Sequence, residues 1–249
     1  MFPIRDDNPT LTRSVVTVAL VVVNVLAWVF VQGLGTEPAL STSVCELGAI
    51  PGELLGRVAP GTSVPLGPGM ACVIDPVADW RTALTHMFLH GSWFHLIGNL
   101  WFLWVFGDNV EDSMGGLRFV LFYVVCGLAA FAAQAATSPG SAIPMVGASG
   151  AIGGVMGAYA RLYPRAPVHL LIIFFLWVDR TVVPAVLMLG YWFVIQVLGG
   201  IPALASETGG VAFWAHVGGF LAGIALVGVF TKPERVAAHR ALLGRRAVR

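Results

Sequence analysis

The chain has 249 residues, of which 57% are hydrophobic and only 11% are charged, and its mean hydropathy is +0.82. Because a soluble domain carries about one quarter charged residues, this composition excludes an ordinary soluble globule and indicates one helical membrane domain. The net charge of +1 provides no basic field for nucleic acid, and three cysteines are too few for a disulfide framework.

Six segments are apolar and close to the length of about 20 residues that a membrane-spanning helix needs. The first follows a short N-terminal segment, residues 1–14. Since no small-residue cleavage site comes after it, we interpret it as a retained helix and not as a signal peptide. In chain order, the predicted helices are Val15–Gln32, Trp93–Phe106, Leu117–Ala136, Ile143–Leu162, Val182–Leu198 and Val211–Phe230.

Three further segments complete the predicted organisation. A stretch rich in Gly and Pro, residues 33–84, is predicted to be a long outer loop with short helical pieces. The apolar segment Val168–Val178 is too short to span before Asp179, so we expect it to lie at the membrane interface. The predicted membrane domain therefore covers residues 15–230, and a basic tail, residues 231–249, follows it.

The positive charges indicate the orientation of the six-helix bundle. With both termini in the cytoplasm, only Arg57 and Arg81 of the fourteen Lys and Arg residues fall outside, as the positive-inside rule expects. The other twelve are Arg5, Arg13, Arg118, Arg161, Arg165, Arg180, Lys232, Arg235, Arg240, Arg245, Arg246 and Arg249. We therefore expect an all-α protein with six transmembrane helices and, since no transit peptide is recognisable, a bacterial plasma-membrane location.

Polar residues inside apolar helices are costly and usually face the bundle interior. Ser149 lies among five glycines of the fourth predicted helix, and His216 begins a ladder of small residues in the sixth. Counted from the predicted helix starts at 1.5 Å per residue, both lie about 8 to 9 Å below the outer helix ends. Because glycines let helices approach closely, the pattern predicts a Ser–His dyad, without a carboxylate to orient the histidine. For a lone serine, a small-residue packing face is the alternative.

The second predicted helix and the segment before it carry further polar groups. His95 and Asn99, four residues apart, are neutral donors suited to an oxyanion hole. His86 and His90 would share a face if that stretch is helical, and we interpret them as structural groups that tie down the outer loop. The alternative is a zinc or iron site formed with an acid of the loop. Since H-E-x-x-H is absent, we expect no metal and no cofactor.

In combination, these motifs resemble the rhomboid family of intramembrane serine proteases. The resemblance covers about residues 14–231, in the six-helix order of the family. The matching motifs are Gly147-Ala-Ser149-Gly150, His216-x-x-Gly219-x-x-x-Gly223, His95-x-x-x-Asn99, Trp80-Arg81, His86 with His90, and Gly107-x-x-x-Glu111-x-x-x-Gly115.

The resemblance implies a serine endopeptidase that hydrolyses single-pass transmembrane proteins near the outer face of the membrane, surrounded by lipid. Ser149 would be the nucleophile and His216 the general base. Oxyanion contacts would come from His95, Asn99 and the Ser149 backbone N–H. Glu111 would be a structural hydrogen-bonding residue on the cytoplasmic side.

The sequence departs from several family members at one position and leaves a rival function open. Those members carry an aromatic residue four positions after the serine, packed on the catalytic imidazole, whereas this chain has Gly153, so His216 must be supported from elsewhere. A transporter would need midplane carboxylates that the sequence lacks. A non-catalytic adaptor would use the same fold to bind client helices, and its function would not depend on Ser149.

The cysteines also give an expectation. Cys45 and Cys72 both lie in the predicted outer loop, which faces an oxidising compartment in bacteria. We expect a disulfide between them that constrains the loop. The alternative is two inert buried thiols.

Overall fold

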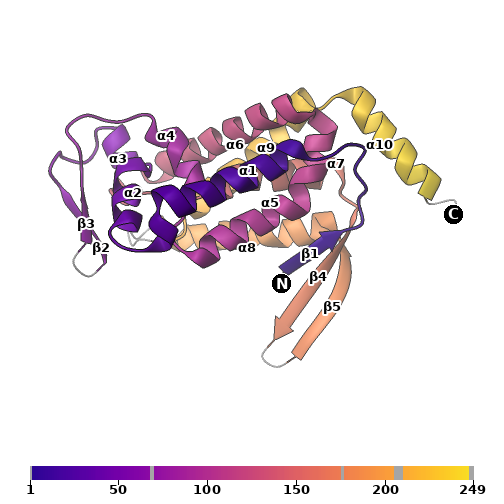
Figure 1. Cartoon of the computed structure of the whole chain (residues 1–249), viewed down its shortest axis with the longest axis horizontal. Helices are drawn as coiled ribbons and strands as arrows, with labels where there is room; N and C mark the ends of the chain where they lie inside the picture. Colours follow the sequence, from indigo (N-terminus) through magenta and orange to yellow (C-terminus); the bar gives the residue numbers. More distant parts are fainter. Residues whose placement is uncertain (1, 68–69, 175–176, 205–209, 247–249) are drawn as a thin grey trace.

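In the computed structural model, which describes residues 2–67, 70–174, 177–204 and 210–246, the chain forms a bundle of long helices (Figure 1). Short loop elements gather at one end of the bundle, and the C-terminal helix lies at the other. Each long helix overlaps a segment that the sequence predicts to be helical. These helices are α1 (Val15–Leu26, extended by the π-helical turn η1, Ala27–Val31), α5 (Trp93–Met114), α6 (Gly116–Thr137), α7 (Ser149–Leu162), α8 (Ala185–Ala203) and α9 (Phe213–Phe230).

Three of the described helices, α6, α8 and α9, are long and apolar enough to cross a membrane. The apolar helix over Val15–Val31 is shorter, α7 has only 14 residues, and α5 carries acidic residues in its last turns. The helices therefore support a membrane-embedded protein. The count of six spanning helices and the outer position of the loop between α1 and α5 stay predictions.

Helix α7 lies at the centre of the bundle. Its residues Gly150–Tyr159 are all buried, and it packs most extensively against α9. A Cβ atom at Gly219 would lie 2.0 Å from the carbonyl oxygen of Gly150, and one at Gly223 would lie 2.0 Å from that of Gly154. Since real Cβ atoms do not approach so closely, only glycine fits these two positions of α9. The small-residue ladders therefore set the distance between α7 and α9.

The predicted start of the fourth helix is wrong by six residues. Residues 143–148 are not helical, and α7 begins at Ser149. Pro144 disfavours the helical conformation for the residue before it, and Gly147 has a φ of +132°, which side-chain-bearing residues rarely adopt. Ser149 therefore lies at the N-terminus of its helix, whereas His216 is the fourth residue of α9. Their distances from the helix starts therefore differ, unlike those counted from the predicted starts.

The expectation of an all-α protein is also wrong, because two small sheets accompany the helices. The described residues of the apolar segment Val168–Val178 belong to two antiparallel paired strands, β4 (Pro167–Phe174) and β5 (Trp177–Pro184). β1 (Phe2–Asp6) pairs with the other edge of β4, so the strand order is β1-β4-β5, and the sheet extends away from the helices (Figure 1). Aromatic and β-branched residues in this segment favour extended structure. Its location at the membrane interface stays a prediction.

The loop between α1 and α5 contains short helical pieces, as predicted. They are η2 (Gly33–Gly35), α2 (Ala39–Leu47), α3 (Pro51–Leu54), α4 (Thr82–Thr85) and η3 (His86–Phe88). The loop also contains a hairpin that the sequence analysis does not predict, in which β2 (Ser63–Gly67) pairs with β3 (Met70–Val73). The expected disulfide between Cys45 and Cys72 is present, and it joins α2 to β3.

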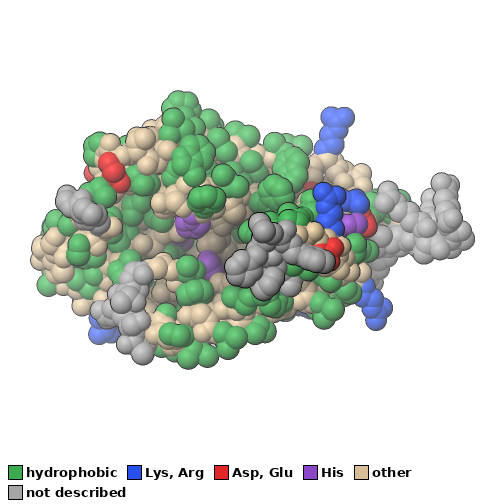
Figure 2. Space-filling model, turned by 90° about the horizontal axis from the view of Figure 1, so that it is seen from below, with side chains coloured by type: hydrophobic (Ala, Val, Ile, Leu, Met, Phe, Trp, Pro, Cys, Tyr) green, Lys and Arg blue, Asp and Glu red, His purple; other side chains and the backbone are tan. Residues whose placement is uncertain are grey.

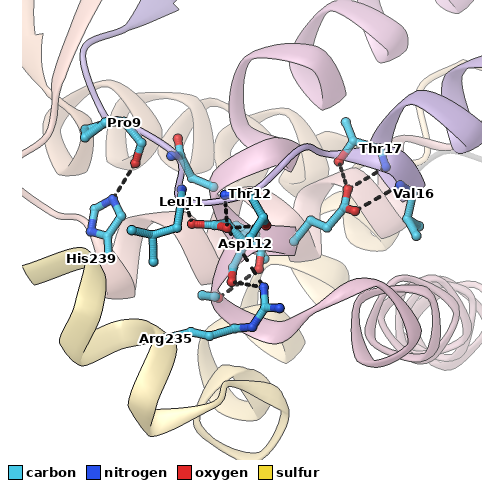
Figure 3. A network of polar contacts seen from close by, with 12 residues as sticks. Pro9, Leu11, Thr12, Val16, Thr17, Asp112, Arg235 and His239 are labelled. Carbon is cyan, nitrogen blue, oxygen red and sulfur yellow. Dashed lines mark hydrogen bonds and ion pairs between the residues drawn. The ribbon is translucent and has the colours of Figure 1, made fainter. Parts of the chain in front are cut away.

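Two carboxylates near the end of α5 hold the N-terminal segment (Figure 3). Glu111 accepts hydrogen bonds from the backbone N–H groups of Val16 and Thr17 at 2.9 and 2.7 Å, and from the Thr17 hydroxyl at 2.8 Å. It therefore pairs N–H groups at the start of α1 that have no partner within the helix. Asp112 accepts hydrogen bonds from the backbone N–H groups of Leu11 and Thr12, which precede α1. The hydrogen-bonding role predicted for Glu111 is confirmed, while its cytoplasmic side stays a prediction.

The predicted basic tail contains a helix that the sequence analysis does not predict. This helix, α10 (Pro233–Arg246), packs near the end of α5. Arg235 donates to the backbone oxygen of Asp112 at 3.0 Å, and His239 Nε2 lies 2.8 Å from the carbonyl oxygen of Pro9 (Figure 3). The last three residues of the tail lie outside the described residues.

Candidate active site

The structure brings the two predicted dyad residues together. Ser149 is the first residue of α7, and His216 lies in the first turn of α9. The hydroxyl Oγ of Ser149 is 2.8 Å from Nε2 of His216, although the two residues are 67 positions apart in the sequence. The close glycine contact between α7 and α9 places these first turns side by side. A hydroxyl held against an imidazole nitrogen is the arrangement in which the ring can take the proton of a nucleophile.

The other ring nitrogen of His216 has a partner that the sequence analysis misses. Nδ1 lies 2.8 Å from Oε1 of Gln196 on α8, and the ring centroid of Trp192, one turn earlier, lies 5.8 Å from that of the imidazole. The sequence analysis considers only carboxylates for this position. A signal was available, because Gln196 is a polar residue inside an apolar helix and such residues usually face the bundle interior.

A cavity of about 1030 Å³ opens beside the dyad, and His95 and Asn99 also line it. Figure 2 shows His side chains at the bottom of a hollow in a mostly hydrophobic face. Within the described ranges, no charged side chain lines this cavity. The described lining therefore offers hydrogen-bonding groups and no charged side chain to a bound molecule.

His95 and Asn99 present N–H groups to this cavity from successive turns of α5. The Nδ2 atom of Asn99 is buried and makes no hydrogen bond to the described residues. The backbone N–H of Gly91 donates to Nδ1 of His95 at 3.3 Å, which leaves Nε2 as the N–H donor of a neutral ring. A Cβ atom at Gly147, two residues before Ser149, would lie 2.7 Å from this Nε2. The Nε2–H group of His95 therefore lies close to the backbone of Gly147.

The predicted role of His86 and His90 in tying down the outer loop is supported only in part, because neither ring nitrogen of His90 makes a hydrogen bond to the described residues. The helical turn at His86 ends before His90, so the two do not share a helix face. Nδ1 of His86 lies 3.1 Å from the carbonyl oxygen of Thr82, while the backbone of His90 exchanges two hydrogen bonds with the Gln32 side chain. Burial lowers the pKa of His86 to about 4 and that of His90 to about 3, so both rings are neutral at pH 7.

The remaining predicted groups lie away from the dyad. Arg81 forms an exposed ion pair with Asp79 at 2.7 Å, and the cavity lining does not include it. In the described part of the chain, no three His, Cys, Asp or Glu residues form a group that could hold a metal ion. That the protein works without a metal or cofactor stays a prediction.

Comparison with protein families gives a match that contains this site. The model of the family described as Rhomboid domain matches residues 77–233, which is more than half of the chain. The matched region includes α5 through α9, and therefore all the residues that contact Ser149 and His216 in the structure.

Known proteins are similar to this chain over part of their length. Rhomboid-like protein 11, chloroplastic, of Arabidopsis thaliana is 31% identical over 162 residues, which are 61% of this chain and 53% of that protein. Rhomboid protein 1, mitochondrial, of Saccharomyces cerevisiae is 31% identical over 156 residues, 60% of this chain and 42% of that protein. Rhomboid protease GluP of Bacillus subtilis is 40% identical over 80 residues, 32% of this chain and 15% of that protein. The chain thus spans about half or less of these relatives.

Proposed function

Because this chain belongs to the rhomboid family, we propose that it is an intramembrane serine endopeptidase in which Ser149 and His216 form the catalytic dyad. The observation that carries the proposal is the 2.8 Å contact between Ser149 Oγ and His216 Nε2, next to a large cavity whose described lining includes no charged side chain. The similarity to a relative that is named a rhomboid protease supports peptidase activity.

In the proposed reaction, Ser149 Oγ attacks the scissile carbonyl carbon while Nε2 of His216 takes the hydroxyl proton. His216 then gives this proton to the leaving amine, and the peptide bond breaks. A water molecule from the cavity hydrolyses the acyl-enzyme, with His216 again acting as the base. Both steps need the ring nitrogen that faces Ser149 to be unprotonated at the start.

The negative oxygen of the tetrahedral intermediate needs donors that are free to reach it. Asn99 Nδ2 and His95 Nε2 are side-chain candidates, since the first is buried without a partner and the second lies close to the backbone before the serine. The backbone N–H of Ser149 is a third candidate. It is the first N–H of α7, a position that has no acceptor within the helix and lies at the positive end of the helix dipole.

We propose that the substrates are single-pass transmembrane proteins, cut near the outer face of the membrane. A substrate helix hides its scissile carbonyl in an internal hydrogen bond, so it must unwind locally before attack, and Gly, Pro or small residues lower that cost. The proposed topology has six spanning helices within residues 15–230, with residues 1–14 and 231–249 in the cytoplasm of a bacterium. An impermeant maleimide applied to intact cells should then label Thr62→Cys and spare Glu234→Cys, whereas equal labelling would refute this topology.

The test of the dyad uses cleavage of a reconstituted single-pass membrane protein and labelling by a fluorophosphonate. Ser149→Ala and His216→Ala should each abolish cleavage, and the double variant should be little worse, because the two residues act as a unit. Chelators should have no effect. Cleavage that persists in Ser149→Ala would overturn the proposal. A wild-type protein that binds membrane proteins but neither cleaves nor reacts with the fluorophosphonate would favour the adaptor function.

A further inference from the structure

We propose that Gln196 on α8 is a positioning residue for His216, so that the dyad operates as a Ser–His–Gln arrangement in which the third member is a neutral amide. Trp192, one turn earlier on the same helix, supports the imidazole ring. This inference rests on the proposed peptidase function. It adds that a helix carrying neither dyad residue holds the base in its working orientation.

The orientation of the Gln196 amide determines which nitrogen of His216 carries the proton. Nε2 of Gln196 donates to the carbonyl oxygen of Trp192 at 3.4 Å, and Oε1 lies 2.8 Å from Nδ1 of His216. An amide oxygen only accepts, so Nδ1 is the protonated nitrogen of the neutral ring. Nε2 is then free to accept the Ser149 hydroxyl at 2.8 Å. Gln196 therefore selects the tautomer in which His216 is a base toward the serine.

Trp192 replaces the aromatic residue that several family members carry on the serine helix. Its ring plane is tilted by 34° to that of His216, and it also packs on Phe220, with ring centroids 6.0 Å apart. Gly153 on α7 leaves the room for this arrangement. A Cβ atom there would lie 3.1 Å from the His216 carbonyl oxygen and 3.8 Å from the Trp192 ring. The support for the imidazole thus comes from α8 instead of α7.

The surroundings of Gln196 give it no other evident purpose. It is 8% exposed on a helix whose outward side chains are apolar, including Leu187, Val194 and Leu198. Interhelical hydrogen bonds add little to the stability of membrane bundles, so stability alone does not explain a buried amide here. Among the described residues, Ser149 on α7 and His95 on α5 are further polar groups that act on His216. No carboxylate among the described residues lines the cavity, so a carboxylate introduced at position 196 would change the electrostatic field at the His216 ring.

The experiment compares Gln196→Leu, Gln196→Glu and Tyr191→Leu, a change at an exposed position of the same helix. Without an acceptor for Nδ1, Gln196→Leu should lower kcat by about 10- to 100-fold with KM little changed, the range found for partners that orient metal-bound histidines and for misplacements of about 1 Å. Compared with the leucine variant, Gln196→Glu again offers an acceptor to Nδ1 of His216, so its turnover should recover. Its carboxylate also stabilises the imidazolium, so the acid limb of the pH–rate profile should move upward by about 1 to 3 pH units. Tyr191→Leu should match the wild type.

The outcomes separate this proposal from the dyad itself. Turnover and fluorophosphonate labelling are measured per folded molecule, alongside the melting temperature, and Gln196→Met replaces the leucine variant if that one does not fold. A wild-type kcat and pH profile in the leucine or methionine variant would overturn the positioning role while leaving the dyad intact. So would a Gln196→Glu profile that does not move. Cleavage by Ser149→Ala would instead remove the dyad and this inference together.

Discussion

The glycine contact between α7 and α9 gives a prediction whose size can be worked from the structure. Gly219 lies three residues after His216, and its missing side chain faces the carbonyl oxygen of Gly150, the residue after Ser149. In Gly219→Ala, the new Cβ would lie 2.0 Å from that oxygen, whereas ordinary van der Waals contact begins at 3.4 Å. The obstacle is backbone, so the two helices must separate by about 1.4 Å at this level, the difference between these distances.

That separation acts directly on the dyad. If His216 moves with its helix, the 2.8 Å contact with Ser149 lengthens to about 4 Å, which is beyond hydrogen-bond reach. A misplacement of about 1 Å costs about 100-fold in rate, and a steric insertion in a packed core costs about 1 to 3 kcal/mol of stability. Gly219→Ala should therefore lose about 100-fold in turnover per folded molecule and melt at a lower temperature.

Two matched variants make the test specific. Gly190→Ala on α8 places its Cβ in open space, with nothing within 4 Å, and should change neither turnover nor melting temperature appreciably. Gly223→Ala meets the carbonyl oxygen of Gly154 at 2.0 Å, but one turn further from His216, so it should lose similar stability and less activity. Turnover on a reconstituted substrate, fluorophosphonate labelling and thermal melts are compared. Wild-type turnover and melting in Gly219→Ala would refute the claim that this contact sets the dyad distance.

Three further predictions concern other parts of the molecule. Asn99→Ala should lower turnover by about 10²- to 10³-fold if its amide stabilises the oxyanion; normal turnover with a lowered melting temperature would instead make Asn99 a structural interhelical contact. Glu111→Ala leaves two N–H groups of α1 without their acceptor and should lower the unfolding free energy by about 2 to 5 kcal/mol; since Glu111 lies three turns beyond Asn99 on α5, turnover per folded molecule should persist, and its loss would contradict this purely structural role. Burial raises the pKa of Asp6 to about 6 from 3.8, so this carboxyl keeps a proton that it loses in the unfolded chain, and its own contribution to stability falls as the pH rises from about 4 to 6. Asp6→Asn removes this contribution, so the melting temperature of the variant relative to the wild type should rise between pH 4 and 6, and a difference that does not change with pH would rule out Asp6 as its source.

Local sequence determined which segments form the bundle helices. A long apolar run in lipid satisfies its backbone hydrogen bonds only within a helix, so the order and approximate positions of α1, α5, α6, α8 and α9 follow from hydropathy, although α5 runs eight residues past its predicted end at Phe106. The two residues of the proposed dyad could also be selected locally, because Ser149 and His216 stand out as polar groups in glycine-rich helices. Cys45 and Cys72 could be paired because they are the two cysteines of one loop.

Tertiary structure decided the features that depend on distant partners. The sheet forms because β1 and β4, more than 160 residues apart, pair their backbone N–H and C=O groups, so hydropathy alone did not predict strands in Val168–Val178. The start of α7 depends on the non-helical residues 143–148, which lead to Ser149 and contact the loop. Above all, the sequence marks Gln196 as a buried polar residue but does not say what it faces. Its contact with His216 exists only once α8 packs beside α9, because the rotation and depth of one helix against another are set by the side chains of both.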